Sequence, residues 1–327
     1  MPEKKISKMP LKNINRFVLT AQITLVFVYL VIIAGSVVRA TGSGMGCPDW
    51  PKCFGNWVPP TDVSQLPENY KALYAGEHHA VAEFNALNTW TEYLNRLAGA
   101  VLGILIFLQF LFSIPLRKTD RRLFRYSLLE LILIGFQGWL GAKVVSSNLA
   151  PVKITIHMVV ALVILSIALL IIHRAKKLVR TEEKEVMDPT LKKLSIVVFG
   201  ASILQILLGT QVREEVDLLL KNFDAIYRNE IISNLGNYFK IHRSFSIILT
   251  ILNFWMIFKI RKTVKTEQVK RNANGLGAVI LVALITGVTL SMFALPAPVQ
   301  PIHLLLACII YGLQWMLILK LWQKQQA

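Results

Sequence analysis

The chain has 327 residues, of which 54% are hydrophobic, and its formal net charge is +17 at neutral pH. Its mean hydropathy of +0.52 is too high for a soluble domain of this size. The basic residues lie in separate clusters between long apolar runs, and this distribution argues against a nucleic-acid-binding surface.

Continuous apolar runs of ~20 residues are the signature of membrane-spanning helices. The first run follows a lysine-rich leader and lacks a convincing small-residue cleavage site, so we expect a retained span rather than a removed signal peptide. The eight runs are Phe17–Val38, Tyr93–Ile114, Tyr126–Val145, Ile154–Ile172, Leu194–Val212, Ile241–Ile260, Leu276–Leu295 and Ile302–Leu321.

The lysines and arginines cluster before the first run and after the second, fourth and sixth, at residues 4–16, 117–125, 174–184 and 259–271. The other connections carry few basic residues for their length or balance them with acidic ones. Because loops on the cytoplasmic side are enriched in lysine and arginine, this pattern predicts a multi-pass protein of the cytoplasmic membrane with both termini in the cytoplasm.

A long external loop is predicted between Arg39 and Trp90, and it contains Cys47 and Cys53. Two cysteines six positions apart on the oxidising side are good disulfide candidates. Two unpaired thiols in a Gly/Pro-rich turn are the alternative. A metal-binding pair is disfavoured, because no histidine or cysteine partner shares the characteristic spacing.

The chain repeats itself, and a repeat signals duplicated architecture. Three matches occur in the same order: Gly35–Arg39 with Gly209–Arg213, Asn95-Arg96 with His242-Arg243, and Gly141…His157 with Gly287…His303. Four spans per copy give both copies the same orientation, related by an axis along the membrane normal. We therefore predict an all-α protein of two tandem four-helix bundles, residues 1–180 and 181–327.

Three histidines are predicted near the external ends of spans four, six and eight: His157, His242 and His303. Imidazoles from two helices of a bundle commonly hold a haem iron axially. His242 and His303 therefore predict a haem site in the second half. The alternative for each histidine taken singly is a hydrogen-bonded or interfacial side chain.

In the first half, the corresponding pair is Asn95 and His157. Asparagine is a poor haem ligand, so this site is expected to hold its iron through one histidine or to bind haem less permanently. Glu92 lies on the same helical face as Asn95 and Arg96, whereas its counterpart in the second half is Phe239. A carboxylate beside a cofactor pocket can accept protons or stabilise positive charge. The alternative is an ordinary salt bridge with Arg96.

Four arginines are predicted at the same external level: Arg39, Arg96, Arg213 and Arg243. Arginine pairs with carboxylates such as haem propionates through charge-assisted hydrogen bonds. Snorkelling to lipid headgroups is the alternative for each of them.

These features together resemble the haem A synthase family. The resemblance covers nearly the whole chain and rests on eight spans in two halves, the GCPDWPKC loop, the EYLNR opening of span two, and the histidines that open spans four, six and eight. It implies oxidation of a methyl group of haem O to the formyl group of haem A, for cytochrome oxidase. Haem O synthase, the farnesyltransferase that makes haem O, and cytochrome oxidase are the implied partners.

The resemblance also implies roles for individual residues. His242 and His303 would ligate a haem b, His157 would ligate the substrate haem, and Glu92 would be the acidic residue implicated in catalysis. Cys47 and Cys53 would match the external cysteine pair found in many members. The sequence departs from the family at Asn95, where many members have a histidine.

Two other functions would account for part of the pattern. A di-haem cytochrome b that relays electrons from quinol would share the histidines, but it has no need of Glu92 opposite Phe239. A repeat-built transporter would place charges or broken helices near the bilayer midplane, where these spans are apolar.

Overall fold

The computed structural model describes residues 11–75, 83–179, 188–222 and 231–322. Throughout these ranges the regular secondary structure is helical, apart from an isolated bridge between Cys53 and Asn56. Eight of the described helices are long and apolar enough to cross a membrane. The predictions of an all-α fold and of eight spans are confirmed.

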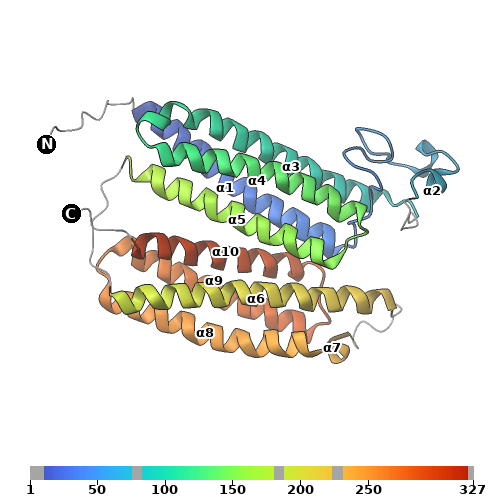
Figure 1. Cartoon of the computed structure of the whole chain (residues 1–327). Coiled ribbons are helices and arrows are strands. Elements are labelled where there is room, and N and C mark those ends of the chain that lie inside the picture. The colour runs from blue at the N-terminus through green and yellow to red at the C-terminus, as the bar shows by residue number, and fades with distance from the viewer. Residues whose placement is uncertain (1–10, 76–82, 180–187, 223–230, 323–327) are drawn as a thin grey trace. The chain divides into compact units, whose positions relative to one another are not determined.

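The chain forms two compact units, Met1–Thr181 and Glu182–Ala327. The long described helices of the first unit are α1 (Leu11–Ala40), α3 (Ala86–Ser113), α4 (Arg121–Ser146) and α5 (Pro151–Lys176), coloured blue to lime in Figure 1. Helix α1 packs on α3 and α5, and α4 packs on the same two helices. The four therefore form a closed ring.

The loop between α1 and α3 lies at the end of this unit where α1 ends and α3 begins (Figure 1). Its described part includes two short helices, η1 (Val63–Gln65) and α2 (Tyr70–Leu73). At the opposite end, η2 (Pro115–Lys118) connects α3 to α4. The apolar core of the unit lies towards that opposite end. Phe17 of α1, Leu123 of α4 and Ile171 of α5 are fully buried there in one cluster.

The second unit repeats the ring. Its described helices are α6 (Pro189–Asn222), α7 (Ile231–Asn234), α8 (Asn237–Thr263), α9 (Glu267–Met292) and α10 (Val299–Leu321). Helices α6 and α9 each pack on both α8 and α10. The core includes Leu191, Met256 and Leu276.

Helix α6 is longer than the predicted span, which ended at Val212. The helix continues to Asn222, through a polar segment that leaves the apolar run. Arg213 and Asp217 stabilise this extension with an i,i+4 ion pair, in which Nη2 lies 2.7 Å from Oδ1.

The turns that lead into α5 and α10 have the same backbone conformation. Each has two successive residues with positive φ: Asn148 (53°) and Leu149 (60°) before α5, Ala294 (53°) and Leu295 (57°) before α10. In each turn the leucine N–H donates to a carbonyl five residues earlier, at 3.0 Å and 3.1 Å. This bond and the left-handed residues are features of a Schellman-type helix end. The repeated sequence thus gives a repeated entry to the two helices that carry His157 and His303.

The left-handed conformation of Ala294 gives a stability prediction. Glycine adopts positive φ without the steric cost that alanine pays, so Ala294→Gly should raise the free energy of unfolding by about 0.5–1 kcal/mol. The thermal midpoint in detergent measures this. Ala278→Gly, at an exposed position inside α9, is the control and should lower stability by about 1 kcal/mol. A lower midpoint for Ala294→Gly would contradict the account.

Candidate functional site

A disulfide between Cys47 and Cys53 closes the loop that follows α1. Both cysteines have no exposed surface, and they pack in a cluster with Phe54 and Tyr70. Thr89 of α3 binds the residue before Cys47, because its hydroxyl donates to the Gly46 carbonyl at 2.9 Å. The cysteines therefore belong to a packed loop subdomain rather than to an open turn.

Gly46 is the closest approach of this loop to α3. A Cβ at this position would lie 2.6 Å from the carbonyl carbon and oxygen of Asn88. Only a residue without a side chain lets the two backbones meet here. The contact places the next loop residues, including Cys47, directly over the first turns of α3.

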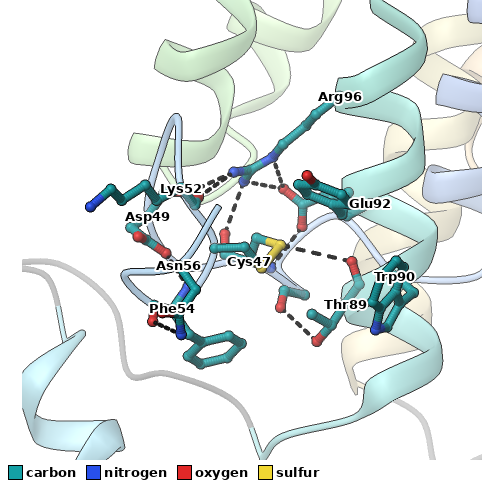
Figure 2. The surroundings of a disulfide bond; sticks show 12 residues. Cys47, Asp49, Lys52, Phe54, Asn56, Thr89, Trp90, Glu92 and Arg96 are labelled. Atoms are coloured by element: carbon teal, nitrogen blue, oxygen red, sulfur yellow. Dashed lines mark hydrogen bonds and ion pairs between the residues drawn. A yellow bond between two sulfur atoms is a disulfide. The ribbon is translucent and has the colours of Figure 1, made fainter. Parts of the chain in front are cut away.

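Glu92 lies on α3 beneath the disulfide and is 3% exposed. Its Oε2 accepts a hydrogen bond from the backbone N–H of Cys47 at 3.0 Å. Its Oε1 accepts from Nε and Nη2 of Arg96, at 3.1 Å and 2.5 Å. Figure 2 shows the carboxylate between the guanidinium and the disulfide loop. The salt bridge with Arg96 that the sequence left open is therefore present.

The guanidinium of Arg96 also binds backbone carbonyls of the disulfide loop. Nη1 donates to the carbonyls of Asp49 and Lys52, at 2.6 Å and 3.0 Å, and Nη2 donates to the carbonyl of Cys47 at 3.1 Å (Figure 2). Together with the bonds to Glu92, these contacts use all five N–H donors of the guanidinium. A propionate contact at Arg96 would require one of these bonds to break.

The other predicted propionate contacts lie at the same kind of position, near the ends of long helices. Arg39 is in the last turn of α1. Arg213 of α6 hydrogen-bonds the side chain of Gln300 at the start of α10. The guanidinium of Arg243 lies 5.6 Å from the ring centre of Phe239, a cation–π contact within α8.

A close contact recurs in four helix pairs, α1 with α3, α4 with α5, α6 with α8, and α9 with α10. In each pair, a glycine on the first helix faces an imidazole or amide on the second. The distances run from the ideal Cβ position of the glycine to the nearest side-chain atom of its partner. They are 3.7 Å for Gly35 and Asn95, 3.5 Å for Gly141 and His157, 3.2 Å for Gly209 and His242, and 3.3 Å for Gly287 and His303.

These contacts place Asn95 of the first unit where the second unit has His242. Both side chains lie on the second helix of their pair, opposite a glycine of the first. The same holds for His157 and His303.

The described residues fit a haem at these positions. Ring nitrogen Nδ1 of His157, Nδ1 of His242 and amide oxygen Oδ1 of Asn95 are buried and have no hydrogen-bond partner. Leaving buried polar atoms unpaired costs free energy, so these matched positions are places where a bound group would complete the surroundings. Each imidazole has a second ring nitrogen, Nε2, and iron is a partner that imidazole suits.

Sequence reasoning missed the side chains that support the histidines. Gln137 donates to the backbone carbonyl of His157, and Gln205 to that of His242, each at 3.0 Å. The amide nitrogen of Gln205 also lies 3.4 Å from Nε2 of His242. A signal was available, because each glutamine precedes its glycine, Gly141 or Gly209, by four residues.

A second buried acid was also missed. Glu130 of α4 is fully buried, and its Oε2 accepts from Nε2 of Gln109 on α3 at 2.5 Å. Its sequence signal is an isolated carboxylate inside an otherwise apolar span, a position that is costly in a membrane. The corresponding position of α9 is Leu276.

Together these features define an all-helical, multi-pass membrane protein whose helix pairs present half-buried imidazoles, or in one pair an amide, opposite glycines. A model of the cytochrome oxidase assembly protein family (COX15-CtaA) matches residues 19–315, and the chain belongs to this family.

The chain is similar to several proteins named haem A synthase. The one from Shewanella oneidensis is 30% identical over 188 residues, which are 58% of this chain and 54% of that protein. Those from Flavobacterium psychrophilum and Flavobacterium johnsoniae are 22% and 21% identical over 314 and 315 residues. The matched segments are 86% of this chain and 91% of each Flavobacterium protein. The chain thus spans about half of the Shewanella relative and nearly all of the other two.

The five hydrogen bonds of the Arg96 guanidinium predict that Arg96→Lys strongly destabilises the protein. Lysine keeps the charge but cannot satisfy three carbonyls and a carboxylate at once. We expect a loss of about 2 kcal/mol or more in the free energy of unfolding, and faster reduction of the disulfide by a water-soluble phosphine. Thermal midpoint and thiol labelling measure the two effects. The control is Arg243→Lys, at the matching position of α8, which should cost less. An Arg96→Lys protein as stable and as resistant to reduction as wild type would refute the assigned role.

Proposed function

We propose that the chain is a haem A synthase, which oxidises a methyl group of haem O to a formyl group through a hydroxylated intermediate and so supplies haem A for cytochrome oxidase. Family membership and the similarity to haem A synthases along most of the chain support this. The observation that carries it is the unequal pair of matched sites: Asn95 has a buried acid nearby in the first unit, whereas the described residues of the second unit give His242 no buried acid.

The second unit would hold a haem b, with His242 and His303 as the axial ligands of its iron. Two imidazoles from facing helices saturate the iron and favour electron transfer over substrate binding. A haem so held supplies one-electron redox chemistry. The chain itself would hold the two imidazoles in place. Gln205 hydrogen-bonds the backbone carbonyl of His242, and Gly287 of α9 lies close to the ring of His303.

The first unit would bind haem O as its substrate, with His157 on the iron. Asn95, at the position that His242 has in the second unit, would supply an amide that can hydrogen-bond but is a poor iron ligand. The Nδ1 of His157 has no partner, so this ring is held less tightly than one with both nitrogens engaged. Weaker ligation suits a haem that must arrive as substrate and leave as product.

Glu92 would accept protons, or stabilise positive charge, while the methyl group is oxidised. Oε1 is occupied by two donors of Arg96, whereas Oε2 accepts from the Cys47 N–H. Oε2 is therefore the atom with a lone pair available for a proton. The disulfide loop would position this oxygen and exclude water from it, because Glu92 is almost fully buried.

Arg39, Arg213 and Arg243 would pair with haem propionates near the external surface, where charge-assisted bonds are strong. The apolar farnesyl tail of haem O would lie among the lipid-facing helices. Haem O synthase and cytochrome oxidase would be the partners that deliver the substrate and receive the product.

Both termini would lie in the cytoplasm, with the disulfide loop on the opposite face of the cytoplasmic membrane. Clusters of basic residues at the ends of η2, α5 and α8 support this orientation. A C-terminal reporter that is active only in the cytoplasm should be active, and an inactive reporter on a well-expressed fusion would contradict the orientation.

The catalytic role of Glu92 predicts the outcome of Glu92→Gln. The amide keeps the shape, but its single oxygen can accept from either Arg96 or Cys47 and not from both, and it cannot take up a proton at neutral pH. In cells that make haem O, wild type should yield haem A in extracted haems. We expect Glu92→Gln to lower that yield about 100-fold or more while haem b remains bound.

Two results would contradict this proposal. Normal haem A from Glu92→Gln would remove its catalytic role. A wild-type protein that binds haem b but yields no hydroxylated or formylated haem would instead be a relay cytochrome.

The single ligation of the substrate haem predicts the effect of Asn95→His. A second imidazole should convert a high-spin ferric substrate haem to a low-spin one and slow its release. Electron paramagnetic resonance of protein loaded with haem O measures the spin state. If the wild-type substrate site is already fully low-spin, Asn95 does not leave the iron with one protein ligand.

A further inference from the structure

Thr286 of α9 hydrogen-bonds the histidine that faces it from α10. Its Oγ1 lies 2.8 Å from Nδ1 of His303, and the same hydroxyl donates to the backbone carbonyl of Ala283 at 2.9 Å. A hydroxyl has one proton. With that proton directed to Ala283, the hydroxyl oxygen can accept from His303, and we assign Nδ1 of His303 as the donor.

This bond determines the tautomer of His303. With the proton on Nδ1, the other ring nitrogen, Nε2, has a free lone pair, and a neutral imidazole binds a metal through such a nitrogen. The neighbouring Gly287 leaves room for the Cε1 edge of the same ring, at 3.3 Å from the ideal Cβ position. Two consecutive residues of α9 thus fix the ring, one by a hydrogen bond and the other by close approach.

The first unit lacks this arrangement. The residue before Gly141, at the position of Thr286, is Leu140, which is buried and has no hydroxyl. Correspondingly, Nδ1 of His157 has no partner, and neither has Nδ1 of His242. Of these three histidines, His303 is the one whose Nδ1 lies within hydrogen-bond distance of a side-chain hydroxyl of the described residues.

We propose that Thr286 is a positioning residue that presents Nε2 of His303 to the haem b iron and lowers the reduction potential of that haem; this rests on the function proposed above. An acceptor on the outer ring nitrogen raises the basicity of a ligating histidine. A more basic ligand stabilises ferric over ferrous iron, and second-shell hydrogen bonds of this kind are one of the means by which proteins set haem potentials.

The proposal also accounts for the difference between the two halves. A histidine with its ring fixed suits a cofactor that stays, and His303 has that support. A histidine without it suits a haem that is exchanged, and His157 faces Leu140 instead. Thr286 would therefore be one of the side chains by which the two copies of the same helix pair acquired different roles.

Substitution of Thr286 tests this on the full-length protein. Thr286→Val keeps the shape and removes the acceptor, whereas Thr286→Ser keeps the hydroxyl. The control is Thr289→Val on the same helix, since the Thr289 hydroxyl is exposed and donates to the Ile285 carbonyl at 2.9 Å. The readouts are haem b content and its reduction potential, measured by spectroelectrochemical titration of purified protein.

We expect the potential to rise in Thr286→Val, to return to the wild-type value in Thr286→Ser, and to stay unchanged in Thr289→Val. A Thr286→Val protein that retains haem b at the wild-type potential overturns the proposal, as does an equal shift in Thr289→Val. If Thr286→Val purifies without haem, then Thr286→Ser must bind haem at wild-type content and potential, and its failure to do so also overturns it.

His303→Ala separates this inference from the proposed function. If His303→Ala loses the haem b spectrum while Thr286→Val leaves the potential unchanged, only the role of Thr286 is wrong. If His303→Ala keeps the full haem b spectrum, the ligand assignment itself is wrong, and the role of Thr286 is wrong with it.

Discussion

The close approach of a glycine on one helix to an imidazole or amide on the next is the constraint on which the other features depend. It recurs at Gly35, Gly141, Gly209 and Gly287. A Cβ at Gly209 or Gly287 would lie only 3.2–3.3 Å from a ring carbon, closer than packed side chains ordinarily allow. Without a side chain at these positions, each imidazole or amide can approach the backbone of the neighbouring helix closely, and the polar groups of that helix lie within its reach.

Those polar groups differ between the units, and the difference is chemical. In the second unit, Thr286 orders the ring of His303, and a second histidine, His242, takes the matching place on α8. In the first unit, Asn95 takes that place, and a buried carboxylate, Glu92, lies one turn away, clamped by Arg96 and the disulfide loop. Under the proposed function, a single helix-pair design would support an electron-transfer site in one copy and an acid-bearing substrate site in the other.

The spans and the candidate ligands could be predicted from the sequence because both depend on local pattern. Apolar runs set the helices, and the equal spacing of Gly141 to His157 and of Gly287 to His303 marked the matching pairs. The bonds of Arg96 could not be predicted, because its partners are backbone carbonyls of Cys47, Asp49 and Lys52, and any residue type supplies a carbonyl. Thr286 was missed since a threonine in an apolar helix is unremarkable until the rotation of α9 against α10 is known.

The unequal roles of the two units are tested most directly by comparing the haem inventories of His157→Ala and His303→Ala. Both proteins would be purified from cells that make haem O, and their haems extracted and identified. The account predicts that His157→Ala keeps its haem b and yields no haem A, whereas His303→Ala loses haem b. Loss of the same haem in both variants, or normal haem A from His157→Ala, would contradict it.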